Sequence, residues 1–209
     1  MIATITPTRG DRPQFLANCK QQLARMNTPV KSYFIDYPPK SSEIDLIARV
    51  REGIRQAKAD GFEFVFIVED DDFFPADYFD NLNLLNTDFI GDQSTIYYHL
   101  KFRAYQDWEH ENRASLFTTG FRISSLFEFV WPDDNERFLD VSLWRYATQN
   151  KKIRIQWRKT GAIGIKHGIG LCGGKGHIQR GKYQDQSFEW LKNRVDLESY
   201  EFYTSMFKK

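Results

Sequence analysis

The sequence predicts an α/β protein in which helices flank a mainly parallel sheet, with a smaller β/α portion after it. Residues 1–90 carry strand and helix signals in the order β-α-β-α-β-α, the pattern of a parallel sheet with covering helices. Residues 64–68 (FVFIV) form a continuous apolar run, as expected for a strand buried on both faces of such a sheet. The length of 209 residues suits a single domain, 1–209.

The first strand and helix are marked by an apolar run and a proline. Residues 2–6 (IATIT) predict a short strand that enters a turn at residues 7–10. Asp11 is expected to cap the next helix, with Pro13 in its first turn. The apolar side chains of this helix are Phe15, Leu16, Leu23 and Met26.

The second strand and helix follow the same plan. Residues 33–35 (YFI) predict a strand that ends at Asp36. Ser41 or Ser42 then opens a long helix that stops near Gly61. Its apolar positions recur at helical spacing and are Ile44, Ile47, Ala48, Val50 or Arg51, and Ile54.

The regular alternation of strands and helices is expected to end with a helix at 76–85, within the first 90 residues. After this helix we expect strands at 95–100 and 114–123, an amphipathic helix at 136–148, strands at 152–157 and 162–166, and a helix at 184–206 that is interrupted near Val195 and Asp196. A glycine-rich loop, residues 168–177 (GIGLCGGKGH), precedes the last helix. This later half is less regular than the first.

Composition excludes several classes of protein. Hydrophobic residues make up 41% and charged residues 27%, which indicates a folded core rather than disorder. The two cysteines, Cys19 and Cys172, form no paired zinc motif, and free thiols in a reducing compartment are expected. The N-terminus does not resemble a signal peptide, and no stretch is long enough to span a bilayer. A cytoplasmic location is therefore the expectation.

The net charge of +1 hides an asymmetry along the chain. Residues 1–136 carry 14 Lys/Arg and 22 Asp/Glu, a difference of −8, whereas residues 137–209 carry 15 and 6, a difference of +9. A basic final third indicates a polyanionic partner, a phosphate-bearing ligand, or an intramolecular complement to the acidic first part.

Four adjacent carboxylates, Glu69 to Asp72, end the buried strand at residues 64–68. Like charges this close repel, so a compensating group is expected. Ligands of open α/β sheets bind beyond the carboxyl ends of the strands. Asp70 and Asp72 alternate along an extended segment and can share a ligand such as Mg²⁺ or Mn²⁺, which two carboxylates and phosphate oxygens commonly hold. A solvated acidic turn is the alternative.

Three segments together resemble a known family. They are ITPTRGDRPQFL near the N-terminus, FVFIVEDDDFFPADYF from Phe64, and RFLDVSLWRYA from Arg137. They resemble the GT-A glycosyltransferases, close to the large family 2 group, whose DXD motif follows a buried strand and binds the metal of a nucleotide-sugar. The resemblance implies a Rossmann-like GT-A sheet, with residues 1–92 binding the nucleotide-sugar and residues 93–209 forming the acceptor-binding and catalytic half.

The resemblance also implies roles for individual residues. The donor-binding residues would be Thr6, Pro7, Thr8 and Arg9, then Asp36, then Arg49 or Arg51. Asp70 and Asp72 would be the DXD pair, with Asp71 as a further candidate because three aspartates leave the register open. His167 would complete the metal site, and Asp140 would be the catalytic base.

The residues themselves leave alternatives open at the later positions. Asp140 begins an amphipathic helix and can equally be an N-cap. His167 borders the glycine-rich loop, where it can bind metal or face solvent. That loop could wrap a diphosphate with backbone N–H groups and Lys175, although it lacks the Walker A ending. His177 in the same loop is the rival metal ligand.

The sequence therefore predicts a metal-dependent glycosyltransferase of the hexosyltransferase type, which uses Mn²⁺ or Mg²⁺ and most simply a UDP-sugar. A hydroxymethylated base in phage-type DNA is one possible acceptor, and saccharides or proteins are others. A nucleotidyltransferase shares the sheet and metal logic, but its glycine- and arginine-rich opening loop is absent from TPTRGDRP. A non-catalytic nucleic-acid-binding module is disfavoured because the acidic cluster would repel phosphate.

Overall fold

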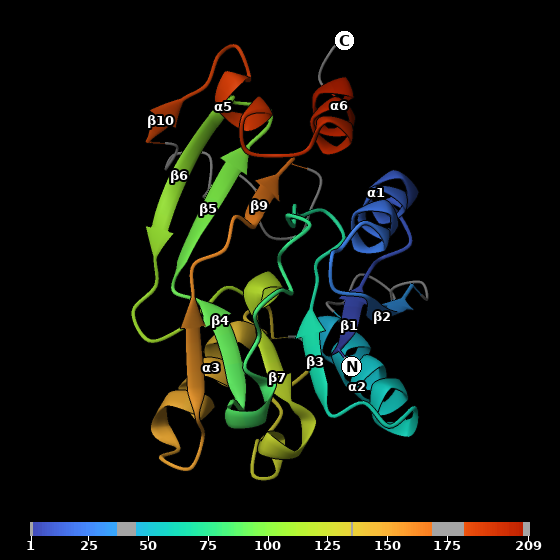
Figure 1. Cartoon of the computed structure of the whole chain (residues 1–209), viewed down its shortest axis with the longest axis vertical. Helices are drawn as coiled ribbons and strands as arrows, with labels where there is room; N and C mark the ends of the chain where they lie inside the picture. Colours follow the sequence, from blue (N-terminus) through green and yellow to red (C-terminus); the bar gives the residue numbers. More distant parts are fainter. Residues whose placement is uncertain (1, 37–44, 135, 169–181, 207–209) are drawn as a thin grey trace.

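Two sheets build the computed structural model of the chain, which describes residues 2–36, 45–134, 136–168 and 182–206. The larger sheet has the strand order β2-β1-β3-β7-β4-β8 (Figure 1). Its strands are β1 (Ile2–Pro7), β2 (Val30–Ile35), β3 (Phe64–Ile67), β4 (Phe89–Asp92), β7 (Gly120–Arg122) and β8 (Ile155–Arg158). Only the pairings of β7 with β3 and β4 are antiparallel, which confirms the mainly parallel sheet.

The smaller sheet has the order β10-β6-β5-β9 and lies beside the carboxyl ends of β1 and β3 (Figure 1). Its strands are β5 (Ser94–His99), β6 (Ala104–Glu109), β9 (Ile163–Lys166) and β10 (Tyr183–Gln184). β5 and β9 run parallel, and the other two pairings are antiparallel. This sheet is the smaller β/α portion expected from the sequence.

The helices of the described residues are α1 (Pro13–Ala24), α2 (Leu46–Ala59), α3 (Leu139–Gln149), α5 (Glu189–Lys192) and α6 (Leu197–Ser205). The same part of the chain has short 3₁₀ turns at η1 (Leu84–Asn86), η2 (Leu116–Thr118) and η3 (Ile123–Leu126). No helix among the described residues is long and apolar enough to cross a membrane.

Helices cover both faces of the larger sheet, as β3 demonstrates. Val65 and Ile67 belong to a core cluster that includes the apolar faces of α2 and α3. Phe64 and Phe66 point the other way, into a cluster with α1 and the segment that follows β3. Successive side chains of a strand alternate between the two faces of the sheet. The continuous apolar run is therefore buried on both faces, as the sequence predicted.

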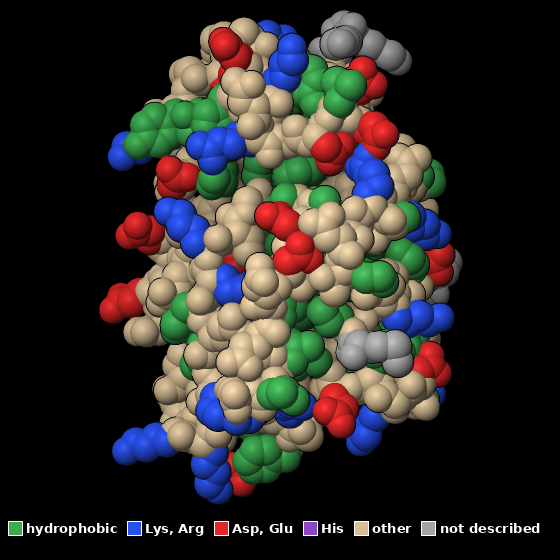
Figure 2. Space-filling model, in the orientation of Figure 1, with side chains coloured by type: hydrophobic (Ala, Val, Ile, Leu, Met, Phe, Trp, Pro, Cys, Tyr) green, Lys and Arg blue, Asp and Glu red, His purple; other side chains and the backbone are tan. Residues whose placement is uncertain are grey.

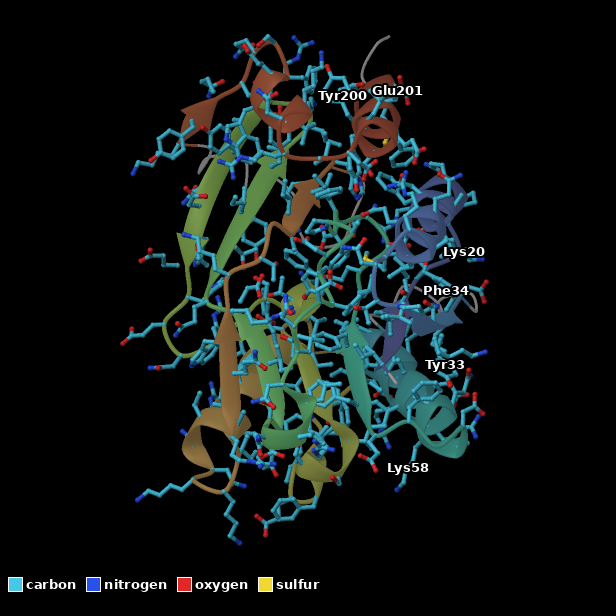
Figure 3. All side chains as sticks on the ribbon, viewed as in Figure 1. Lys20, Tyr33, Phe34, Lys58, Tyr200 and Glu201 are labelled. Atoms are coloured by element: carbon cyan, nitrogen blue, oxygen red, sulfur yellow. The ribbon has the colours of Figure 1, made fainter. Side chains whose placement is uncertain are left out.

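The edge strand β2 is covered on one face by α1. Lys20 of α1 lies over the ring of Phe34 in β2, with its ammonium 4.9 Å from the ring centre (Figure 3). The ammonium therefore lies against the face of this ring, a cation–π contact. The contact protects one face of a strand that has a single neighbour in the sheet.

Three expectations about local structure were wrong. Residues 76–85 form turns instead of a helix, and Asn81 has φ 56°, a left-handed conformation that cannot continue an α-helix. Arg12, not Asp11, is the N-cap of α1, and its side chain makes no capping bond. Residues 114–123 contain η2 and only a short strand, β7.

Other elements agree with the sequence or were missed. The interruption near Val195 and Asp196 is confirmed, because Asp196 caps α6 by accepting a hydrogen bond from the Ser199 N–H. The strands β4, β6 and β10 were not predicted. The expected start of α2 at Ser41 or Ser42 lies outside the described residues, and within them the helix begins at Leu46.

Candidate active site

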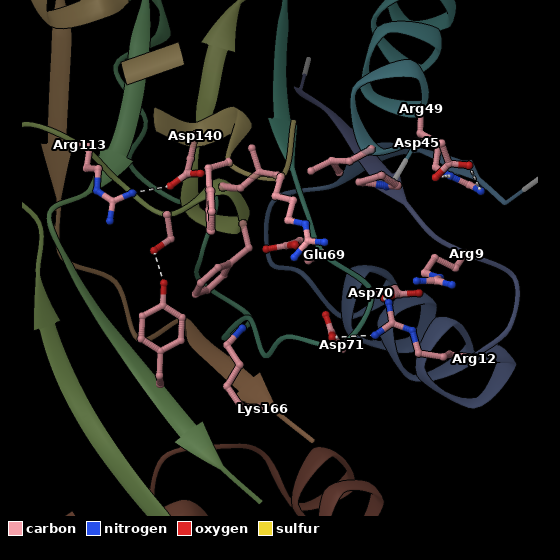
Figure 4. Close-up of a pocket in the computed structure, with 18 of the residues that line it drawn as sticks. Arg9, Arg12, Asp45, Arg49, Glu69, Asp70, Asp71, Arg113, Asp140 and Lys166 are labelled. Carbon is pink, nitrogen blue, oxygen red and sulfur yellow. Dashed lines mark hydrogen bonds and ion pairs between the residues drawn. The ribbon is translucent and has the colours of Figure 1, made fainter. Parts of the chain in front are cut away.

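A pocket of about 240 Å³ lies at the carboxyl ends of β1 and β3. Figure 4 shows Arg113 and Asp140 at one end of it and Arg9, Arg12, Asp70 and Asp71 at the other, with Glu69 and Lys166 between them. The open α/β sheet thus places its pocket where such folds bind ligands.

At the end of the pocket formed by Arg12, Asp70 and Asp71, two carboxylates share one guanidinium. Asp70 accepts hydrogen bonds from the Thr8 hydroxyl and, at 2.7 Å, from Nη2 of Arg12. Asp71 Oδ2 accepts from Nη1 of Arg12 at 2.9 Å and lies 2.8 Å from Nε2 of His167. The structure thus brings Asp70 and His167 to the same guanidinium.

Asp72 has a different environment. It is only 1% exposed, it does not line the pocket, and its Oδ1 accepts a hydrogen bond from the Ile165 N–H at 2.7 Å. The next residue, Phe73, forms a two-way backbone bridge with Ile163. This pairing with β9 turns the Asp72 carboxylate away, so Asp71, and not Asp72, lies beside Asp70 at the pocket.

Side chains from both ends of the chain hold in place the segment Glu69 to Asp72, hereafter the acidic loop. Gln22 of α1 accepts a hydrogen bond from the Phe74 N–H at 2.8 Å and donates to the Asp72 carbonyl at 3.2 Å. The Tyr203 hydroxyl of α6 donates to the same carbonyl at 3.1 Å. Buried polar groups rarely remain unpaired, and here those pairs fix the position of the loop.

Burial and charge separate the pKa values in the acidic cluster. Burial, together with the charge of Asp71, raises the pKa of Glu69 to about 7. Burial also acts on Asp71, but the hydrogen bond with His167 holds the pKa of Asp71 below its usual range. Burial lowers the pKa of Lys166, yet the carboxylates, Asp72 first, raise it above the ordinary lysine value. Nearby cationic side chains therefore offset part of the negative charge of the cluster, and burial offsets another part because it favours the protonated form of Glu69.

Of the two arginines expected near the nucleotide, Arg49 lines the pocket and Arg51 does not. Arg49 is 1% exposed, donates to the Thr8 and Ile35 carbonyls, and forms a two-pronged ion pair with Asp45 at 2.7 and 2.8 Å. It therefore ties the ends of β1 and β2 together. Arg51 is exposed and lies over the Trp131 ring.

Of the other predicted donor-binding residues, some line the pocket and others do not. Pro7 and Arg9 line the pocket, and Arg9 pairs with Asp11 at 3.2 Å. Thr6 is fully buried, while Asp36 is exposed and not part of the pocket wall. Lys175 and His177 lie outside the described residues.

At the opposite end, Asp140 stands in the first turn of α3 and lines the pocket. Phe138 is the N-cap of that helix, so Asp140 does not occupy the capping position that the sequence left open. Nη1 of Arg113 donates to Asp140 Oδ2 at 2.9 Å. Burial raises the pKa of Asp140 although Arg113 lowers it. A buried carboxylate with a raised pKa is a stronger base than a solvated one.

The pocket contains a polar group that the sequence analysis missed. The Ser115 hydroxyl lies 2.6 Å from the Tyr97 hydroxyl and 3.0 Å from Nε2 of His110. Burial, and then the charge of Arg113, lowers the pKa of His110 to about 4, so its imidazole is neutral at pH 7. These side chains come from β5 and from the loop before η2, and no motif or regular spacing connects them.

Within the described ranges, no group of three or more His, Cys, Asp and Glu side chains is arranged to hold a metal ion. The chemistry of one donor set nevertheless fits a hard cation. Oxygens of Asp70 and Asp71 and Nε2 of His167 all contact the guanidinium of Arg12, at 2.7, 2.9 and 3.2 Å. These three residues therefore surround one positively charged group.

No family model matches the sequence, and no curated protein matches it significantly. Solved structures do match. The UDP-GlcNAc complex of residues 1–349 of Staphylococcus aureus TarS has a TM-score of 0.56 and 12% identity, over 79% of this chain and 58% of that one. Its UDP complex has a TM-score of 0.53 and 12% identity, over 78% and 60%. This chain has a GT-A-like fold.

The GT-A-like assignment concerns the fold alone, because the identities are low. The chain spans less than two thirds of the TarS structures that it matches. A glycosyltransferase involved in glycosylating the major capsid of PBCV-1 is also similar, with a TM-score of 0.48 and 13% identity over 84% of this chain and 96% of that one.

Proposed function

We propose that the chain is a glycosyltransferase that moves a sugar from a nucleoside diphosphate sugar, most simply a UDP-sugar, to an acceptor hydroxyl. The observation that carries this proposal is the division of one pocket into two ends. Three arginines and the acidic loop occupy one end, and a partly buried Asp140 faces the same cavity from the other. The UDP and UDP-GlcNAc complexes of the TarS structures support it.

In this proposal the end of the pocket that contains the acidic loop binds the donor. Arg9, Arg12 and Lys166 line the same pocket as the acidic loop and would contact the diphosphate, while Arg49 positions the ends of β1 and β2. Mn²⁺ or Mg²⁺ would be held by Asp70 and Asp71 with His167. A bound cation would neutralise charge on the departing diphosphate. This assignment replaces the expected pair of Asp70 and Asp72, because Asp72 does not line the pocket.

At the other end Asp140 would act as the general base of an inverting transfer. Its carboxylate accepts the proton of the acceptor hydroxyl as the hydroxyl oxygen bonds to the anomeric carbon. The bond between that carbon and the diphosphate oxygen breaks, and the electron pair leaves with the diphosphate. The pKa of Asp140, raised by burial, suits this role, and Arg113 orients the carboxylate through the 2.9 Å ion pair.

The acceptor is the open half of the proposal. A hydroxymethylated base in DNA would require free basic side chains to neutralise phosphates. Arg154 pairs with Asp88, and Arg158 with Asp92, so part of the basic final third is used internally. Lys151 and Lys152 are exposed. A salt-dependent gel shift with duplex DNA, flattened in the Lys151→Ala/Lys152→Ala variant, would favour DNA. No shift even at low salt would leave a saccharide or protein acceptor.

The direct test is to incubate the protein with Mn²⁺ and a panel of nucleoside diphosphate sugars. Glycosyl transfer, or slow hydrolysis in its place, releases a nucleoside diphosphate. A nucleotidyltransferase would instead form or consume pyrophosphate. The proposal is supported if the wild type releases UDP from a UDP-sugar and the Asp140→Asn variant does not. It is contradicted if the protein releases no nucleoside diphosphate from any donor.

A further inference from the structure

We infer that in the donor-free protein the guanidinium of Arg12 occupies the place of the divalent cation, so that Arg12 and the cation exclude each other. This inference rests on the proposed function, because the cation is part of it. It assigns Arg12 a role beyond donor binding: it keeps the acidic loop closed to cations until a donor arrives.

The first argument is geometric. Nη2 of Arg12 lies 2.7 Å from Asp70 Oδ1, and Nη1 lies 2.9 Å from Asp71 Oδ2 and 3.2 Å from Nε2 of His167. The arginine side chain is only 10% exposed. The three groups that would bind a cation thus already surround one positively charged group.

The second argument is a conflict at His167. Its Nε2 lies 2.8 Å from Asp71 Oδ2, a carboxylate oxygen that can only accept a hydrogen bond. The same nitrogen lies 3.2 Å from Nη1 of Arg12, which can only donate one. One ring nitrogen cannot serve both partners at once. A cation in place of the guanidinium removes the conflict, because the lone pair of Nε2 and the Asp71 oxygen could then both bind it.

The third argument is that Arg12 has another position to move to. Its Nε makes no hydrogen bond among the described residues and lies 3.8 Å from Asp11 Oδ1. The Asp11 side chain is half exposed and already pairs with Arg9 at 3.2 Å. A displaced guanidinium can therefore join Arg9 at the donor end of the pocket, where both arginines would meet the diphosphate.

The inference has an electrostatic consequence for the cation. A unit positive charge a few ångströms away opposes cation binding even in high dielectric. The wild-type protein should therefore bind Mn²⁺ weakly on its own and more tightly when a diphosphate adds negative charge. Removing the charge of Arg12 should remove most of that difference.

The test is a calorimetric titration with Mn²⁺ alone, without nucleotide, at fixed pH. Arg12→Gln should bind Mn²⁺ about tenfold or more tightly than the wild type. Arg9→Gln is the matched control, because it removes the same charge from the same pocket but from a side chain that makes no hydrogen bond or ion pair with Asp70 or Asp71 among the described residues. The affinity of this variant for Mn²⁺ should change far less. Equal or weaker binding in Arg12→Gln, or equal gains in both variants, overturns the inference.

Arg12→Gln could fail to fold, so a measurement on the wild type stands beside it. The guanidinium ¹H–¹⁵N signals of Arg12, assigned by their loss in Arg12→Lys, should shift when excess Mg²⁺ is added, and unchanged signals contradict the inference. Failure of the proposed function is distinguishable. If no variant binds Mn²⁺ but UDP is still released in EDTA, the inference is wrong and the glycosyltransferase proposal stands.

Discussion

Asp140 and Arg113 show how one ion pair can tune a carboxylate. The carboxylate is largely buried, which raises its pKa, and the guanidinium 2.9 Å away limits that rise. A free buried carboxylate would be protonated more readily, and a fully paired one would be a weaker base. The pair therefore holds Asp140 between these limits while fixing its direction into the pocket.

Asp140→Asn should lower the rate of sugar transfer by about 10²–10⁴, the usual range for loss of a general base. Donor affinity should stay nearly constant, because Asp140 lies at the opposite end of the pocket from the acidic loop. The readout is UDP release together with calorimetric UDP binding. Asp133→Asn, an exposed carboxylate before α3 and outside the pocket, is the control. Full activity in Asp140→Asn would remove it from the mechanism.

The pH profile tests the same residue independently. A general base works when deprotonated, so kcat/KM should fall on the acid side as pH drops through the raised pKa of Asp140. Arg113 lowers that pKa, so Arg113→Gln should move the acid limb to higher pH. A limb that stays in place, or moves to lower pH, would show that another group controls the reaction.

At the scale of elements, the pocket depends on how the loop after β3 pairs with β9. The bridge between Phe73 and Ile163 and the bond from the Ile165 N–H to Asp72 bind the loop to the second sheet. Strand signals in the sequence do not reveal which side chain of an acidic run will be used in this way. The pairing decides that Asp70 and Asp71 line the pocket.

Asp72→Asn should therefore keep both the fold and the affinity for UDP with Mn²⁺. The asparagine Oδ1 can still accept from the Ile165 N–H, and the side chain lies outside the pocket wall. Asp71→Asn should weaken UDP binding strongly, because it replaces a carboxylate in the pocket. Parallel titrations compare the two. If Asp72→Asn lost UDP binding and Asp71→Asn kept it, the pair expected from the sequence, Asp70 and Asp72, would be the correct one.

The packing of β4 against α3 gives a stability prediction. A Cβ at Gly91 would overlap the ring of Trp144 and the methyl group of Ala114. Gly91→Ala should lower the free energy of unfolding by about 1–3 kcal/mol, the usual cost of overpacking. Gly161→Ala is the control, since its Cβ would meet only Pro75, at 3.6 Å. Denaturant titration measures both, and equal stabilities would contradict the packing.

At the scale of the whole molecule, the charge asymmetry of the sequence is partly internal. Arg154 pairs with Asp88 at 2.9 Å, Arg158 lies 3.7 Å from Asp92, and Lys166 faces the acidic loop. Each joins the basic final third to the acidic first part. On the face in Figure 2, basic and acidic side chains are interspersed rather than segregated. The intramolecular explanation thus accounts for part of the asymmetry.

The first half of the fold was predictable because its signals are local. A short β-branched segment marked β1, a continuous apolar run marked β3, and helical spacing marked α2. The segment after β3 misled the prediction because Tyr78 and Phe79 are buried by packing around Phe66, not by lying on a helix. The short strand β4 lacks a long apolar run, and β10 has only two residues.

The candidate site was predictable where the resemblance placed a motif at a strand end. Asp70, His167, Asp140 and Arg9 were chosen in this way, and all but His167 line the pocket directly. Arg12, Arg113 and the group around Ser115 were not chosen. Their roles come from contacts between residues far apart in sequence, such as the 155-residue separation between Arg12 and His167. No local pattern records such contacts.

The central claim is that this pocket binds a nucleoside diphosphate through its acidic loop. The most direct measurement is a calorimetric titration of UDP in the presence of Mn²⁺, on the wild type, on Asp71→Asn and on the exposed control Asp133→Asn. The wild type and the control should bind UDP, and Asp71→Asn should bind it at least about tenfold more weakly, a loss of roughly 1.4 kcal/mol. Equal affinities in all three proteins would place the nucleotide elsewhere and contradict the account.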